Sequence, residues 1–239
     1  ELVSNVSHEL RTPLGLIKAA STTLLRQDVT FPPATQQKIL LGISGEADRL
    51  EQLVANLLDI SRLDNNRFFL YLEQVDLNKL VATLVGALRA TLMEKHPTKH
   101  QIVVNAPVAP ILAQIDAAKI EQVMRNLLEN AVRYSPDGGV ITVDVCSTGE
   151  TCELRVSDQG IGIAPDEQER VFERFFRSQD IRVQRIRGAG LGLAICHEIV
   201  RAHGGVLTLT STPGAGSTFA VCLPHVTSSE TVAIVPRTF

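Results

Sequence analysis

Apolar residues recur at helical spacing through the first sixty residues of the chain, in two separate series. Each series alternates steps of three and four, which is the spacing of a heptad seam. The first series comprises Val3, Val6, Leu10, Pro13, Ile17, Ala20 and Leu24. The second follows the breaker DVTFPP at 28–33 and comprises Leu40, Ile43, Ala47, Leu50, Val54 and Leu57. The pattern predicts two long amphipathic helices joined by a short loop, as an antiparallel hairpin.

The apolar face of the second helix is wider than one partner helix can cover, because Ile39, Leu53 and Leu58 extend it. We therefore expect a second copy of the chain to complete a dimeric four-helix bundle. The alternative is that this face packs onto the rest of the same chain.

The periodicity changes after the hairpin. Helical patterns cover 76–94, 116–134 and 191–205, and short β-branched or alternating stretches cover 100–106, 110–115, 139–146, 152–158, 206–211 and 217–224. Residues 164–189 carry no regular pattern. Helices collected on one side of a mostly antiparallel sheet describe an α+β domain. We expect a helical domain at 1–66, a linker at 67–75, the α+β domain at 76–225 and a patternless tail at 226–239.

Composition narrows the functional classes. The 239 residues are 44% hydrophobic, which is enough for a sizeable core, and the net charge of -3 provides no broad basic field for nucleic acid. No apolar run approaches the roughly 20 residues of a membrane helix. Because the chain begins inside a helical pattern, we expect a cytoplasmic fragment whose membrane attachment, if any, lies upstream. Four scattered cysteines without CxxC spacing indicate a reducing compartment, with Cys146 and Cys152 as buried thiols.

One histidine in the first helix stands out by its position. If Val3 is heptad position a, His8 falls at f, the position farthest from the seam, so we expect it to face water or a docking partner. Glu9 is its neighbour, and Thr12 lies one turn further on the same side. Pro13 lacks an amide donor and should bend the helix there.

A polar stripe interrupts the helix predicted at 116–134. Asn126, Asn130 and Arg133 lie on one face at i, i+4 and i+7, with Tyr134 adjacent. Amide oxygens suit Mg²⁺ beside phosphate oxygens, and an arginine one turn later can contact those phosphates. A solvated helix face accounts for the asparagines about as well.

Two glycine-bearing turns follow. In DQGIGI, Asp158 ends a strand, so its carboxylate can accept a hydrogen bond from an exocyclic amine such as that of adenine. A surface aspartate in a hairpin turn is the alternative. In GAGLGL, the glycines at 188, 190 and 192 come immediately before a helix, whose start attracts anions. That spacing matches neither the Rossmann nor the Walker pattern.

Six segments together resemble the two-component sensor histidine kinases, in their dimerisation and phosphotransfer domain followed by their ATP-binding domain. In family order, these segments are SHELRTPL, NLLENAVRYSP, DQGIGI, VFERFFR, GAGLGL and GAGSTF. The resemblance covers residues 1 to about 224 and implies a Bergerat-type α/β sandwich after the helical hairpin. Two departures are Gln159, where the family commonly has Asn, and Arg133, where it often has Lys.

The resemblance implies a role for each matching residue. His8 would be the phosphoacceptor, Glu9 the general base, and Thr12 the residue that orients water when the domain dephosphorylates its partner. Asn130 would hold Mg²⁺. The implied ATP-binding residues are Asn126, Asn130, Arg133, Tyr134, Asp158, Gly160, Ile161, Gly162, Gly188, Gly190, Leu191, Gly192, Leu193 and Ser217. Phe172, Phe175 and Phe176 would pack the lid rather than touch the nucleotide.

The implied activity is that of a protein-histidine kinase. It would use ATP and Mg²⁺, work as a homodimer, and pass the phosphoryl group to an aspartate in the receiver domain of a response regulator. Two other classes stay open: an ATPase-driven conformational module, and a scaffold of the same fold that transfers no phosphate.

Overall fold

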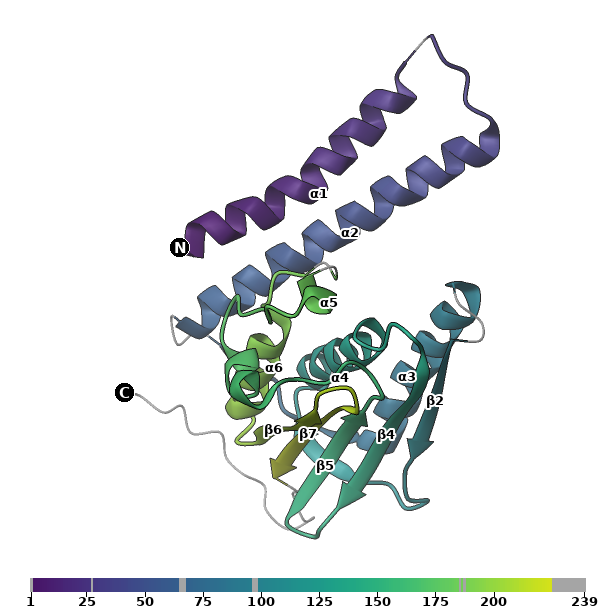
Figure 1. Ribbon diagram of the computed structural model, residues 1–239. Helices are drawn as coiled ribbons and strands as arrows, with labels where there is room; N and C mark the ends of the chain where they lie inside the picture. Colours follow the sequence, from purple (N-terminus) through teal and green to yellow (C-terminus); the bar gives the residue numbers. More distant parts are fainter. Residues whose placement is uncertain are drawn as a thin grey trace.

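The computed structural model of the protein describes residues 2–26, 28–64, 68–95, 99–184, 186 and 188–224, and the expected tail at 226–239 lies outside them. The side chains of residues 2–5, 8, 9, 62–64 and 93–95 also lie outside this description. A two-helix stem projects from an α+β domain that lies against the last turns of its second helix (Figure 1). Among the described helices, none combines the length and apolar character that a membrane crossing requires.

The stem has the predicted antiparallel form, with α1 at Leu2–Leu24 and α2 at Pro33–Asp64. The first seam is confirmed from Val6 onwards, and Val3 lies outside the described side chains. Val6, Leu10, Ile17, Ala20 and Leu24 are partly buried and Pro13 is buried, whereas Arg11, Thr12 and residues 14–16 between them are exposed. The helix continues through Pro13. Helix α2 begins inside the predicted breaker, at Pro33, because proline is well suited to the first position of a helix.

The second seam divides between two partners. Ile43, Leu50 and Leu57 are partly buried, but Leu40 and Val54 are 55% and 46% exposed. Buried instead are Leu53 and Ile60, and Ile60 belongs to the hydrophobic core shared with the α+β domain. The alternative of packing onto the same chain therefore accounts for one stripe of α2. The stripe with Leu40, Val54 and Leu58 stays uncovered within the chain.

The α+β domain is built on a five-stranded sheet in the order β2-β4-β5-β7-β6. Its strands are β2 (His100–Asn105), β4 (Gly139–Ser147), β5 (Thr151–Ser157), β7 (Gly216–Pro224) and β6 (Val206–Thr212). Only β2 and β4 run parallel, and every other pairing is antiparallel, as predicted. Helices α3 (Leu77–Lys95), α4 (Ala117–Arg133) and α6 (Gly192–Ala202) cover one face of this sheet (Figure 1).

A separate two-stranded sheet joins β1 (Glu73–Asp76) to β3 (Leu112–Ile115). The sequence pattern does not predict strand β1, which falls partly in the expected linker at 67–75. The irregular stretch before α6 contains two short 3-10 turns, η1 (Pro165–Glu167) and η2 (Arg170–Phe172), and a one-turn helix α5 (Ile181–Gln184).

Alternation along the strands places the core between the sheet and its helices. Ile141, Val143 and Val145 of β4 are buried, and the face of α4 with Ile120, Val123, Met124, Leu127, Leu128 and Ala131 packs there too. Cys152 and Cys196 are buried free thiols, and Cys146 is partly buried. Cys146 lies opposite Glu153 rather than Cys152, because the register of β4 and β5 places these cysteines on opposite faces.

Candidate functional site

Asp158 follows the last residue of β5 and is fixed by its own turn. Its carboxylate Oδ1 accepts hydrogen bonds from the backbone N–H of Gly160 at 2.8 Å and of Ser217 at 3.3 Å. Burial raises the pKa of Asp158 above its usual value, although these two bonds act in the opposite direction. Because both bonds use Oδ1, Oδ2 is the oxygen placed to accept from a ligand.

The turn after Asp158 packs on the end of α4. The Ile161 N–H donates to the carbonyl oxygen of Tyr134 at 3.0 Å. A Cβ at position 160 would lie 2.2 Å from that same carbonyl oxygen, so only glycine permits the approach. This contact brings the Asp158 carboxylate beside the polar face of α4.

The polar face of α4 carries the two predicted asparagines. Asn130 Nδ2 donates to Asn126 Oδ1 at 3.0 Å, so the amide oxygen of Asn130 is the atom that this pair leaves for a ligand. A Cβ at Gly192 would lie 2.3 Å from Asn126 Nδ2. Asn126 therefore joins α4 to the start of α6, and Asn130 presents a hard oxygen of the kind that Mg²⁺ prefers.

The described residues of the irregular stretch before α6, 164–184, 186 and 188–191, form a lid over this face. The Phe175 N–H donates to the Gly190 carbonyl oxygen at 2.9 Å, which ties the phenylalanine segment to the glycine motif. Phe172 and Phe175, which we expected to pack the lid, pack against the hydrophobic core of the domain. Phe176 differs from the expectation, because it lines the cavity under the lid, with the Arg170 guanidinium 4.4 Å from its ring centroid.

These elements enclose one cavity of about 700 Å³, which is within the range of ligand pockets. All but one of the ATP-binding residues implied by the sequence line it, and the exception, Gly160, is buried behind Asp158. The chain thus brings residues from five distant motifs to one place.

One wall of the cavity comes from the stem, which sequence analysis missed. Its residues are Arg49, Gln52, Leu53 and Asn56 of α2. The only local signal was the recurrence of polar residues at steps of three and four, at 49, 52, 56 and 59, inside an apolar helix. The heptad pattern assigns only apolar positions to a neighbouring helix, so it predicts no contact for these polar residues.

The predicted phosphoacceptor residues lie on α1. His8 and Glu9 belong to the helix, and their predicted side-chain exposure falls outside the described side chains. Thr12 is exposed, as its position on the helix predicts. Helix α1 runs back from the hairpin loop towards the α+β domain, so its first half, which includes His8, lies towards the end of the stem that meets this domain (Figure 1).

Two family models match the chain in this order. Residues 1–66 match the His Kinase A phospho-acceptor domain, and residues 115–227 match the Histidine kinase-, DNA gyrase B-, and HSP90-like ATPase. The chain is 34% identical over 235 residues to the sensor histidine kinase WalK of Bacillus subtilis, with 96% of this chain and 37% of WalK covered. The chain thus spans well under half the length of that relative.

Solved structures show the same fold. AdeS, a histidine kinase of Acinetobacter baumannii, superposes with a TM-score of 0.71 at 23% identity, covering 91% of this chain and 98% of AdeS. The histidine kinase ThkA, in complex with response regulator protein TrrA, has a TM-score of 0.69 at 20% identity, covering 95% of this chain and 61% of the ThkA chain. The stem matches a phospho-acceptor domain and the α+β domain an ATPase of the same kinases, so the chain belongs to the two-component sensor histidine kinases.

Proposed function

We propose that this chain binds ATP in the lidded cavity and transfers its γ-phosphoryl group to His8. The observation that carries the proposal is the position of the cavity. It is walled on one side by the ATPase-type domain and on the other by α2, the helix that pairs with the His8 helix in the stem. A movement of the ATP-binding domain relative to the stem would then bring nucleotide and acceptor together.

The adenine end of the nucleotide would lie at Asp158. Its Oδ2 accepts a hydrogen bond from the exocyclic amine, because Oδ1 already serves Gly160 and Ser217. The phosphates would lie along Asn126, Asn130 and Arg133, towards the glycine motif at the start of α6. There the backbone N–H groups at the helix start favour negative charge.

In the transfer step, one ring nitrogen of His8 attacks the γ-phosphorus as the bond from that phosphorus to the bridging oxygen breaks. The bridging oxygen leaves with ADP, and the phosphoryl group stays on the imidazole as a phosphoramidate. Glu9 accepts the proton from the other ring nitrogen, which keeps the product neutral at that ring. Positioning and charge neutralisation supply most of the catalysis in such transfers.

The donor set also suits a magnesium ion. Magnesium bound with ATP takes phosphate oxygens and a small number of protein oxygens as ligands. The amide oxygen of Asn130 fits that role. When bound, Mg²⁺ would neutralise phosphate charge and orient the phosphates.

Two partners complete the proposal. A second copy of the chain would cover the stripe of Leu40, Val54 and Leu58 that the single chain leaves exposed, which gives a four-helix bundle. The phosphoryl group would then pass to an aspartate of a response regulator, the class of protein that ThkA binds in its solved complex. Thr12 would orient water when the regulator is dephosphorylated.

Incubation with γ-labelled ATP and Mg²⁺ tests the proposal. We expect a protein label that is stable to alkali and labile to acid, and that disappears in His8→Gln. Release of free phosphate with no labelled protein would instead indicate the ATPase module. A chain that binds no nucleotide would indicate the scaffold.

Variants of two polar residues assign their roles. Asn130→Ala should abolish labelling, and Asn105→Ala, which removes an exposed amide of β2, should leave it unchanged. Thr12→Ala should label normally but impair dephosphorylation of the regulator, unlike Thr22→Ala further along α1. Retained labelling in Asn130→Ala contradicts the magnesium assignment.

A further inference from the structure

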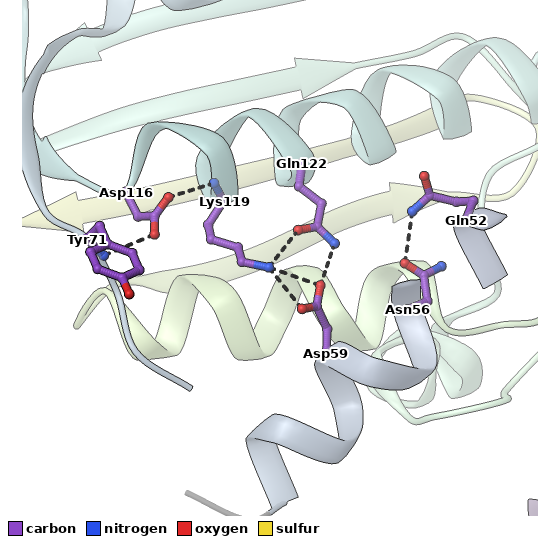
Figure 2. A network of polar contacts seen from close by, with 7 residues as sticks. All are labelled: Gln52, Asn56, Asp59, Tyr71, Asp116, Lys119 and Gln122. Atoms are coloured by element: carbon purple, nitrogen blue, oxygen red, sulfur yellow. Dashed lines mark hydrogen bonds and ion pairs between the residues drawn. The ribbon is translucent and has the colours of Figure 1, made fainter. Parts of the chain in front are cut away.

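Helices α2 and α4 run in opposite directions, and polar residues of both helices line two adjoining hollows, whose lining we call the seam (Figure 2). Along α2 the seam runs from Asp59 back through Asn56 and Gln52 to Arg49. Along α4 it runs forward from Lys119 through Gln122, Asn126 and Asn130 to Arg133. The seam is mostly polar, although it lies between two domains.

A clasp of three residues closes one end of the seam (Figure 2). Lys119 Nζ donates to both carboxylate oxygens of Asp59, at 2.9 and 3.1 Å, and Gln122 Nε2 donates to Asp59 Oδ2 at 3.0 Å. Asp59 is only 5% exposed. The linker reinforces the same end, because the Lys119 ammonium lies 5.2 Å from the centroid of the Phe68 ring and the Tyr71 N–H donates to Asp116 at 3.1 Å.

The other end of the seam opens into the nucleotide cavity. Asn126 and Gln52 border both this cavity and a second hollow of about 550 Å³ beside the clasp. Arg49 borders the nucleotide cavity, and so do Asn130 and Arg133 on the facing helix. The clasp thus fixes which residues of α2 face the cavity.

We propose that Arg49 of the stem binds the terminal phosphates of the nucleotide, with the clasp of Asp59, Lys119 and Gln122 holding it there. The inference rests on the proposed function. It makes the stem a part of the nucleotide site rather than only the carrier of the acceptor histidine.

The charge and position of Arg49 support this assignment. Two other arginines of the cavity lie on the lid side, where Arg182 forms a bidentate pair with Asp180 and Arg177 donates to the Val183 carbonyl oxygen. Arg49 lies on the opposite wall, with its guanidinium 3.9 Å from Glu46 and its side chain 29% exposed. A guanidinium recognises phosphate oxygens through paired N–H donors.

The side of the cavity on which Arg49 lies identifies the phosphates that it would meet. Arg49 belongs to the stem, which also carries His8, and it borders the cavity from that side. In a nucleotide poised for transfer, the group nearest the acceptor is the terminal phosphoryl group. Asp158 lies at the end of β5, beyond α4, where the base would bind.

Titration calorimetry with ATP and Mg²⁺ tests the inference, in a His8→Gln background so that no ATP is consumed. Arg49→Gln should weaken ATP binding roughly tenfold, the effect of losing a charge-assisted bond. Binding of adenosine, which has no phosphates, should change less than twofold. Arg49→Lys, which keeps the charge but not the paired donors, should have an ATP affinity between those of the parent and Arg49→Gln. The control Arg26→Gln removes a charge from the hairpin loop and should bind ATP normally.

The role of the clasp is tested by a double-mutant cycle. In an Asp59→Asn or Gln122→Ala background, whichever keeps native circular dichroism, the effect of Arg49→Gln on ATP affinity should shrink below threefold. An undiminished effect in both backgrounds overturns the clasp's role. Equal ATP affinity of Arg49→Gln and its parent overturns the inference while leaving the proposed function intact. Absence of nucleotide binding by the parent overturns both.

Discussion

Replacing Asp59 by alanine tests how strongly the two domains are joined. The substitution removes three hydrogen bonds, two from Lys119 and one from Gln122, and leaves the Lys119 ammonium beside Phe68 without its counter-ion. Removing one partner of a fully buried ion pair lowers the free energy of unfolding by about 3–5 kcal/mol. The Lys119 side chain is 22% exposed and can turn partly to water, so we expect the free energy of unfolding to fall by about 2–3 kcal/mol.

Urea unfolding followed by circular dichroism measures this loss. The matched control is Asp28→Ala, which removes an exposed carboxylate paired with Arg26 in the hairpin loop and should leave stability unchanged. Lys119→Ala should cost a similar amount to Asp59→Ala, and the double variant should lose clearly less than the two losses added together. If Asp59→Ala unfolds with the same midpoint and slope as Asp28→Ala, the clasp contributes nothing to stability and the reasoning fails.

Three further predictions concern titratable groups. Burial raises the pKa of Asp158, so its contribution to stability is complete below about pH 3.9 and is lost as the pH rises through the raised value. Asp158→Asn should therefore gain urea stability relative to the parent between pH 4 and pH 7, and a constant difference would contradict this. Burial lowers the pKa of His203, whose Nε2 accepts from the Asp116 N–H at 3.1 Å. Its contribution is present above about pH 6.5 and is lost on acidification, so between pH 7 and pH 5 the parent should lose more stability than His203→Gln, and equal losses would rule this out. Burial raises the pKa of Cys196 to about 12, so thiol alkylation of the native chain at pH 8, followed by mass spectrometry, should modify partly exposed Cys222 before Cys196. Equal rates would show that Cys196 is accessible.

Local pattern was enough for most of the fold. The helices and the sheet strands follow from periods of 3.6 and 2, and the cavity residues come from short motifs in which glycine spacing limits the backbone. Strand β1 was missed because Glu73–Asp76 is only four residues long and shows no clear alternation. Its conformation depends on pairing with β3, about forty residues away.

The stem wall of the site could not be predicted, for a different reason. Asp59 and Lys119 are sixty residues apart in the chain, and neither lies in a motif. A heptad description assigns every apolar position of a helix to a neighbouring helix of the bundle. It therefore does not foresee that Leu53 and Ile60 turn towards another domain while Leu40 and Val54 stay exposed.

The division of α2 into three stripes makes the helix sensitive to insertions in a way that depends on their length. One added residue between Ile43 and Gln52 would turn everything before it by about 100° relative to Asp59. That turn would carry Arg49 or the α1-facing side chains off their stripe. Seven added residues would nearly restore the angle but lengthen the helix by about 10 Å, so the acceptor histidine would move by that distance along the stem relative to the cavity. Length variation in this family should therefore be tolerated on the hairpin-loop side of Ile39 and rejected between Ile43 and Asp59.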